Sequence, residues 1–173
     1  MAQEVLIRNP GSRTAGCIIL SRLSPALIFF LAVSSNAWAA SDWTVLRETG
    51  ADNTCVLRSK PAAVYDGYQE SIATLLISPA SLYVISKSVF DPTFADIGMQ
   101  VDHQAFISVD GIEDRRRATF NSHYEEIVTE FKAGREVSVQ MRFWPTWPAQ
   151  GLFPARFSLM GFTKAYEELL LCR

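Results

Sequence analysis

His103 and His123 are the side chains of this 173-residue sequence that could act as a general acid or base near neutral pH, since imidazole titrates in that range. Asp102 precedes His103 directly, but neighbouring residues of a strand point to opposite faces, so this spacing does not form a catalytic dyad. The sequence contains no G-x-S-x-G motif that would present a serine nucleophile. A Ser-His-Asp site would have to be assembled from residues distant in the sequence, and we interpret both histidines as surface residues.

Two pairs of adjacent carboxylates, Glu125-Glu126 and Glu167-Glu168, have the residue types that glycosidases use. Each pair falls on the polar side of a short amphipathic pattern of helical period, where solvated charges are normal. We therefore interpret both pairs as the exposed faces of helices.

Residues 113–117 form a run of charge in which Glu113 and Asp114 are followed by three arginines. Such a run could contact the phosphate groups of anionic lipid or lipopolysaccharide. Adjacent acids and bases largely cancel, so we interpret the run as a solvated turn. A peripheral membrane contact remains an open alternative.

An aromatic, proline-rich stretch, Trp144-Pro145-Thr146-Trp147-Pro148, supplies the candidate partner-binding residues Trp144, Pro145, Trp147 and Pro148. Proline restricts the backbone, and tryptophan is a frequent anchor of protein interfaces. The alternative is that one or both indole rings fold back and cover the core.

The first 39 residues have the order of a secretory signal peptide. Arg8, Arg13 and Arg22 precede an apolar run over residues 23–33, and Ala37-Trp38-Ala39 follows it. A membrane anchor would need about 20 apolar residues, so we expect cleavage after Ala39 and no transmembrane span afterwards.

The expected mature chain, residues 40–173, is long enough for a single β-rich domain with one core. Removal of the leader takes away three arginines and Glu4, which leaves 13 basic and 17 acidic side chains and a net charge of −4. A mildly acidic domain lacks the basic field that nucleic-acid binding requires.

Two cysteines, Cys55 and Cys172, remain after the expected cleavage. An even number of cysteines in an exported chain predicts a disulfide, which would tie the second strand to the end of the chain. The alternative is a pair of buried free thiols. With two histidines and no C-x-x-C spacing, we expect neither a metal site nor a cofactor.

Short alternating or apolar segments predict six to nine antiparallel strands. We place them at residues 42–47, 54–59, 70–77, 82–86, 98–102, 105–109, 117–120, 136–143 and 152–159. Lys60 to Gly67 is expected to be a connection because it contains Pro61, and Asp110-Gly111 is expected to form a tight turn. In residues 136–143, Val137, Val139, Met141 and Phe143 share one face.

Two stretches change to a helical period. The first contains Tyr124, Ile127, Val128 and Phe131, begins at a possible Ser122 N-cap and ends at Ala133-Gly134. The second is C-terminal and places Phe162, Ala165, Tyr166, Leu169 and Leu170 on one stripe. A helix of about ten residues is marginal alone, so it must pack on the sheet. The fold class is therefore mainly β: an antiparallel sandwich or strongly bent sheet with two short helices, one of them C-terminal.

The order of these segments resembles the invasion-associated locus B family of bacterial envelope proteins. The resemblance is carried by Asp42-Trp43-Thr44-Val45, by Cys55, by Ile107-Ser108-Val109-Asp110-Gly111, by Gly134, by Val137-Ser138-Val139 and above all by the closing Ser158-Leu159-Met160-Gly161-Phe162-Thr163-Lys164-Ala165. It implies a periplasmic or outer-membrane-associated β protein without enzymatic activity. Members of that family commonly carry a cysteine pair in the stretch that corresponds to residues 119–126, where this chain has none.

From these observations we expect an exported protein, periplasmic, outer-membrane-associated or secreted, that binds an envelope or secreted protein and catalyses no reaction. An invasion-associated or accessory role is implied by the resemblance. Two alternatives remain open: a small periplasmic hydrolase with a site assembled in space, and an accessory or immunity-type protein of a secretion system.

Overall fold

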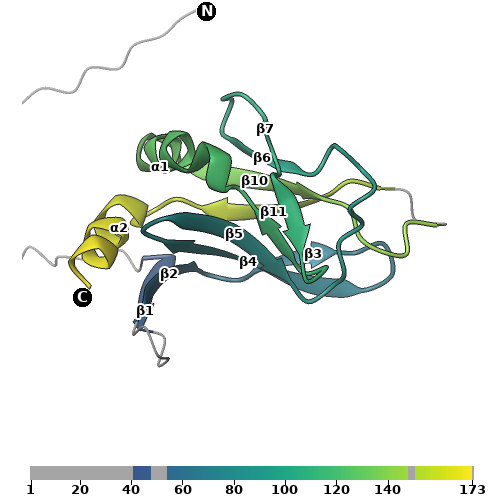
Figure 1. Ribbon diagram of the computed structural model, residues 1–173, viewed down its shortest axis with the longest axis horizontal. Coiled ribbons are helices and arrows are strands. Elements are labelled where there is room, and N and C mark those ends of the chain that lie inside the picture. Colours follow the sequence, from purple (N-terminus) through teal and green to yellow (C-terminus); the bar gives the residue numbers. More distant parts are fainter. Residues whose placement is uncertain (1–40, 48–53, 148–150, 173) are drawn as a thin grey trace, which may run out of the picture. The chain divides into compact units, whose positions relative to one another are not determined.

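The computed structural model describes residues 41–47, 54–147 and 151–172. The expected signal peptide lies outside these residues. The described chain is mainly antiparallel β structure in two sheets with two α-helices, the second of them C-terminal, as the sequence pattern predicts (Figure 1). Eleven strands occur in this part of the chain, more than the six to nine expected, because several are only two to four residues long.

The first sheet has the strand order β1-β2-β4-β5-β9-β8, with β3 also paired to β4. Its strands are β1 (Trp43–Arg47), β2 (Cys55–Ser59), β3 (Ala62–Tyr65), β4 (Glu70–Ser78), β5 (Ser81–Ser86), β8 (Gly111–Glu113) and β9 (Arg117–Thr119). The second sheet has the order β11-β10-β6-β7. Its strands are β6 (Gly98–Val101), β7 (Ile107–Ser108), β10 (Glu136–Met141) and β11 (Phe153–Ser158).

A single buried core joins the two sheets. Along β10 and just beyond it, Val137, Val139, Met141 and Phe143 are all buried, as their alternation predicts. The same period on β5 buries Leu82 and Val84. Alternating residues of an antiparallel strand face opposite sides, so each sheet gives one face to the shared core.

The segment expected to be a connection after β2 contains strand β3 instead. Pro61 lacks an N–H, and this interrupts the pairing at one point only. Arg58 lies opposite Leu76, while Ala62 lies opposite Ala73, so one extra residue is inserted as a bulge. At the bulge the Ser59 hydroxyl accepts a hydrogen bond from the Leu75 N–H, which keeps β4 satisfied and allows pairing to resume.

The expected tight turn at Asp110-Gly111 is wrong. Ile107–Ser108 pairs in the second sheet and Gly111–Glu113 in the first, so the chain crosses between the sheets at this point. The tight turn lies at Asp114 and Arg115, which have positive φ angles of 48° and 59°. The Arg116 N–H donates to the Glu113 carbonyl across this turn. The turn contains no glycine, the residue that usually marks positive φ, and the sequence pattern did not predict it.

Helix α1 (Tyr124–Ala133) follows a 3-10 turn, η1 (Asn121–His123), and ends before Gly134 as expected. Its four predicted apolar residues are buried. Ser122 is not the N-cap: His123 occupies that position without a side-chain hydrogen bond, and the Ser122 N–H donates to the Asp110 carboxylate. Asp110, on the segment that crosses between the sheets, therefore fixes the N-terminal end of α1, and no capping box is formed.

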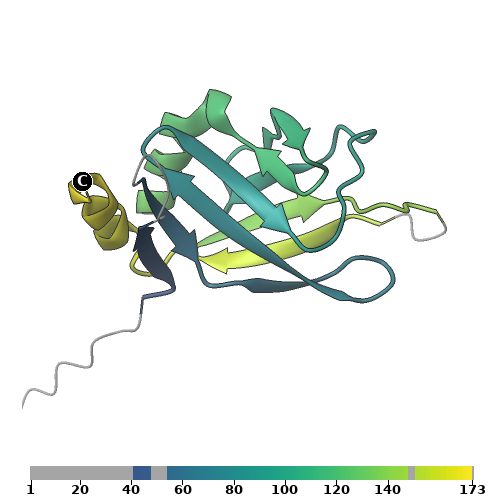
Figure 2. The same ribbon diagram turned by 60° about the horizontal axis from the view of Figure 1, so that its bottom comes forward.

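Helix α2 (Phe162–Leu171) packs beside β1, β2 and α1 (Figure 2). It begins at Gly161, whose φ is 80° and where a Cβ would lie 2.5 Å from the Ser41 hydroxyl oxygen. Both the backbone conformation and the lack of space for a side chain therefore require glycine. Phe162, Ala165, Tyr166 and Leu169 are buried, but Leu170 is 50% exposed. The prediction for Leu170 was wrong because the helix contacts the sheet along a narrower stripe than the sequence pattern suggests.

Candidate functional site

The loop after β10 holds two exposed tryptophans. Trp144 is 59% exposed and Trp147 is 74% exposed, and Pro145 between them is exposed as well. Pro148, the fourth candidate of this stretch, lies outside the described residues. Neither indole ring covers the core, which removes the alternative that the sequence left open.

Thr146 points the other way. It is buried, and its hydroxyl donates to a carboxylate oxygen of Asp91, with the Phe143 carbonyl as a second neighbour at 3.3 Å. The Trp144 N–H donates to the Val89 carbonyl at 2.8 Å, and the Asp91 N–H donates to the Arg142 carbonyl at 2.9 Å. These contacts hold the backbone, so the two tryptophans project from a fixed loop.

The turn between β3 and β4 lies beside this loop. The Tyr68 hydroxyl donates to the Trp147 carbonyl at 2.7 Å. Tyr65 packs edge-on against Phe153 at a centroid distance of 6.0 Å. The large apolar side chains that are exposed on β3, on this turn and on the segment between β10 and β11 are Tyr65, Tyr68, Trp144, Trp147 and Leu152, and we call this set the aromatic end. In Figures 1 and 2 the β3–β4 turn and the backbone that leaves β10 lie at the end of the ribbon opposite α2.

The turn between β3 and β4 is also held by a buried carboxylate, as the tryptophan loop is held by Asp91. Asp66 is 8% exposed and accepts hydrogen bonds from the N–H groups of Tyr68 and Gln69 at 2.9 and 2.8 Å. The Ser88 hydroxyl donates to it at 2.6 Å. Residues 88–91 therefore bind both halves of the aromatic end, through Ser88 to the turn and through Val89 and Asp91 to the tryptophan loop.

The surroundings of both carboxylates favour the ionised form. Burial acts to raise the pKa of Asp66, but the hydrogen bonds from Ser88 and from the backbone of Gln69 and Tyr68 outweigh it and leave that pKa below its ordinary value. Burial likewise acts to raise the pKa of Asp91, and the hydroxyls of Thr146 and Thr93 with the charge of Arg115 lower it further than burial raises it.

Arg142 and Asp96 form an ion pair next to this region. The guanidinium donates to both carboxylate oxygens, with the shortest contact at 2.5 Å, and lies 4.4 Å above the centre of the Phe94 ring. Hydrogen bonds from Arg142 are the main reason that the pKa of Asp96 is lowered. A bidentate pair of this kind fixes the orientation of the strand end that leads into Trp144.

The residues considered for catalysis lie on the surface. His103 is exposed in the turn after β6, and His123 is exposed with its ring nitrogen 3.0 Å from the Glu126 carboxylate. Within the described residues, neither ring is hydrogen-bonded to a serine hydroxyl. The carboxylate pairs Glu125-Glu126 and Glu167-Glu168 are exposed on α1 and α2. The charge run lies on the exposed β8–β9 turn, where Arg117 is 3.5 Å from Glu113.

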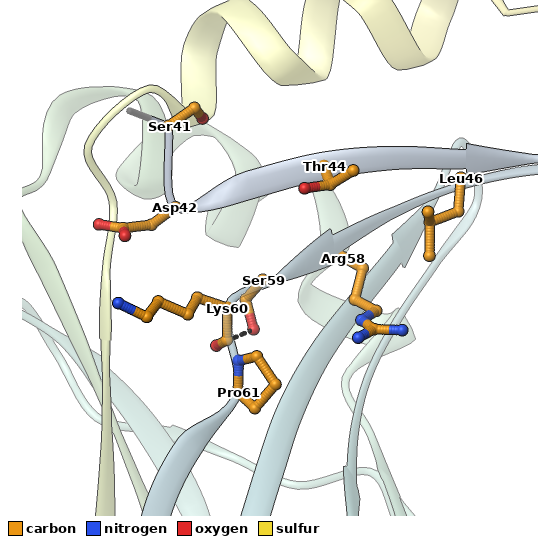
Figure 3. A pocket seen from close by; sticks show the side chains of 8 residues that line it. All are labelled: Ser41, Asp42, Thr44, Leu46, Arg58, Ser59, Lys60 and Pro61. Atoms are coloured by element: carbon orange, nitrogen blue, oxygen red, sulfur yellow. Dashed lines mark hydrogen bonds between the residues drawn. The ribbon is translucent and has the colours of Figure 1, made fainter. Parts of the chain in front are cut away.

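A groove of about 330 Å³ runs along β1, β2 and the Lys60-Pro61 step (Figure 3). Asp42 carries a negative charge into it, while Arg58 and Lys60 carry positive charges. The Ser59 hydroxyl donates to the Lys60 carbonyl and is already an acceptor for β4, so it is not a free nucleophile. The groove offers mixed charge without a recognisable catalytic or metal-binding set.

Cys55 and Cys172 are joined by a disulfide with 6.1 Å between their Cα atoms, the pair that the cysteine count predicts. It ties β2 to the residue that follows α2. The same region contains buried aromatic contacts, including Trp43 against Phe162 at 5.0 Å and Phe131 against Phe162 at 5.3 Å. We call this region the helix end.

Sequence reasoning missed Tyr65, Tyr68, Leu152 and the two buried aspartates. Tyr65 lies in the segment expected to be a connection, and Tyr68 lies just after it, in a stretch for which no strand or helix is predicted. Asp91 precedes Pro92, a pattern typical of turns, and nothing in the sequence pairs it with Thr146, 55 residues away. Only the folded chain brings these residues together.

No protein-family model matches the sequence. No curated protein matches it either. The fold defines a disulfide-linked β protein of two antiparallel sheets. Among solved structures, it is similar to invasion associated protein B from Bartonella henselae, with 19% sequence identity and a TM-score of 0.50 over 75% of this chain and 92% of that chain. At this identity the likeness is one of fold alone, so the family resemblance is supported as a distant fold relationship.

Proposed function

We propose that this protein is an exported bacterial envelope factor that acts by binding another envelope or secreted protein and performs no catalysis. The observation that carries the proposal is the aromatic end, where large apolar side chains are exposed on backbone that buried polar contacts hold in place. Rigid aromatic residues supply much contact area at little entropic cost, and they are frequent hot spots of protein interfaces.

Export is supported by two features. The sequence begins with the pattern of a signal peptide, and we propose that residues 1–39 are removed. Disulfides such as Cys55–Cys172 persist mainly in oxidising compartments, which include the periplasm. Of the helices in the described ranges, none is both long and apolar enough to cross a membrane.

The role as a binding protein rather than an enzyme is supported by the surroundings of the polar side chains. The buried carboxylates Asp66 and Asp91 are used to hold loops, and both histidines lie on exposed turns. The fold likeness to invasion associated protein B supports the hypothesis that this protein has an invasion-associated or envelope accessory role.

Affinity capture from crosslinked envelopes tests this function. Wild type is compared with a Trp144→Ala/Trp147→Ala variant and with a matched control, Leu170→Ala/Leu171→Ala, which removes two exposed apolar side chains from the helix end. We expect mass spectrometry to identify one protein that is held by wild type and by the control and is lost in the tryptophan variant.

Equal capture by all three proteins would show that the aromatic end is not the contact surface. Capture of nothing specific by wild type would contradict the proposal of a protein partner. Circular dichroism of each variant checks that a loss of capture does not come from unfolding.

A further inference from the structure

Two buried negative charges lie directly behind the aromatic end. Asp66 accepts its hydrogen bonds from the Ser88 hydroxyl and two backbone N–H groups, and Asp91 accepts from the side chain and backbone of Thr93 and from the Thr146 hydroxyl. All of these donors are neutral, so they satisfy the oxygens without cancelling the charge. In the described ranges no lysine, arginine or histidine lies within ion-pair distance of either carboxylate.

The net charge of the surrounding segments is also negative. Residues 66–70, 88–96 and 142–147 contain four carboxylates, Asp66, Glu70, Asp91 and Asp96, and one cation, Arg142. Arg142 is paired with Asp96 and its charge also acts on Asp91, as does that of Arg115 on the β8–β9 turn. Among the described residues, Asp66 and Glu70 are the two of these carboxylates on which neither arginine acts. Glu70 is exposed and lies opposite Tyr65 across the β3–β4 pair, so both side chains project from one face.

The aromatic rings add to this field. The face of an indole or phenol ring is the negative side of its quadrupole, and cations bind there, most strongly to tryptophan. A carboxylate behind the ring and the face of the ring in front of it both attract positive charge. Anionic lipid headgroups and nucleic acid are disfavoured by the same field.

Resting on the proposed function, we propose that the aromatic end binds a cationic segment of its partner protein, in which arginine or lysine side chains lie against the exposed rings of Trp144, Trp147 and Tyr68. The apolar stems of these side chains cover the rings, and Glu70 meets a charged head group at the edge of the surface. The expected partner is therefore a protein with a basic segment that is extended or protrudes from its surface.

The test uses a five-residue peptide with two arginines and the same peptide with citrulline, which has the shape of arginine without its charge. Binding to the purified exported protein is followed by NMR through the indole N–H signals. We expect the arginine peptide to shift the signals of Trp144 and Trp147, and the citrulline peptide to bind at least about fivefold more weakly. The signal of Trp43, which is buried at the helix end, should stay in place.

Two variants with matched chemistry locate the effect. Glu70→Gln removes a carboxylate beside Tyr65 and should weaken the arginine peptide about two- to fivefold, while Glu167→Gln removes an exposed carboxylate from α2 and should change nothing. Equal binding of the two peptides, or an equal loss in both variants, would overturn the proposal.

A parallel arm uses vesicles of phosphatidylglycerol. Sedimentation of the protein with these vesicles in a Trp147-dependent manner, without a response to the arginine peptide, would assign the surface to lipid and overturn the proposal. If envelope capture still yields a protein that depends on the tryptophans, while the two peptides bind equally, the proposed function stands and the cationic partner is wrong. Absence of both capture and peptide binding would contradict the two together.

Discussion

The two ends of the molecule use the same residue types for opposite purposes. At the helix end, Trp43 is 4% exposed, its indole N–H donates to the Ser158 carbonyl, and Phe131 and Phe162 pack against it. At the aromatic end, Trp144 and Trp147 project outward, and the small polar Thr146 between them is buried. The two ends differ in what covers the aromatic rings. Helix α2 lies over the rings at the helix end, whereas no described element lies over the rings at the aromatic end.

The ends also differ in how they are held. A covalent bond and an aromatic cluster hold the helix end. Hydrogen bonds to buried carboxylates hold the aromatic end. Apolar packing removes rings from the surface, whereas polar anchoring of the backbone leaves the rings free to contact a partner. The comparison teaches that exposed tryptophans can be ordered without being part of the core.

The largest effect is expected from loss of the disulfide. A Cys55→Ser/Cys172→Ser variant should lose about 4–5 kcal/mol of unfolding free energy, since the bond closes a loop of more than 100 residues in the unfolded chain. Urea unfolding of the variant and of oxidised wild type measures it. The indole signals of Trp144 and Trp147 should stay unchanged in the folded fraction. A shift of those signals would mean that the two ends are coupled.

The tryptophans themselves allow a direct comparison of the ends. Trp43→Ala should cost about 3–5 kcal/mol because it leaves a cavity beside Phe162. Trp147→Ala should change the unfolding free energy by no more than about 0.5 kcal/mol, as for other exposed positions. Urea titration of both variants decides the matter, and a similar cost at the two positions would show that Trp147 belongs to the core.

The polar anchor of the aromatic end is tested by Thr146→Val. This change keeps the shape of the side chain and removes the hydroxyl that donates to Asp91, so it should cost about 1–3 kcal/mol. It should also broaden the indole signals of Trp144 and Trp147. The matched control is Thr163→Val on the exposed side of α2, where little change is expected. A neutral Thr146→Val would show that Asp91 does not hold the loop.

Lowering the pH should reduce the stability of the aromatic end, whereas protonation of Glu130 should favour the folded state around α1. The pKa values of Asp66, Asp91 and Asp96 are lowered in the folded state, so their stabilisation is complete above the ordinary value of about 4 and is lost as the pH falls through the lowered values. Burial, and then the charge of Glu126, raises the pKa of Glu130 on α1, so ionising Glu130 destabilises the folded state as the pH rises through about 4 and beyond.

Hydrogen exchange between pH 3 and 6 measures this contrast. Protection of the amides of the tryptophan loop should fall toward pH 3, and protection around α1 should not fall with it. Glu130→Gln should remove the pH dependence at α1 and leave that of the aromatic end intact. A uniform loss of protection at both ends would contradict the local assignment.

Much of the fold followed from local patterns. The alternation from Val137 to Phe143 predicted a half-buried strand, and the period from Tyr124 to Phe131 predicted α1, because the repeat of a strand or helix decides which residues share a face. The disulfide followed from the count of cysteines in the expected mature chain. These features are local or rest on simple arithmetic.

The sequence by itself determined that Trp144-Pro145-Thr146-Trp147 is a stiff aromatic loop, but not which of its side chains faces outward. That was decided by Asp91, 55 residues earlier in the chain, which accepts the Thr146 hydroxyl and turns the indole rings away from the core. The bulge at Pro61, the crossing at Asp110-Gly111 and the exposure of Leu170 were likewise set by neighbouring strands. Periodicity reports which faces can be buried, whereas the partners that bury them come from distant parts of the chain and exist only in the tertiary structure.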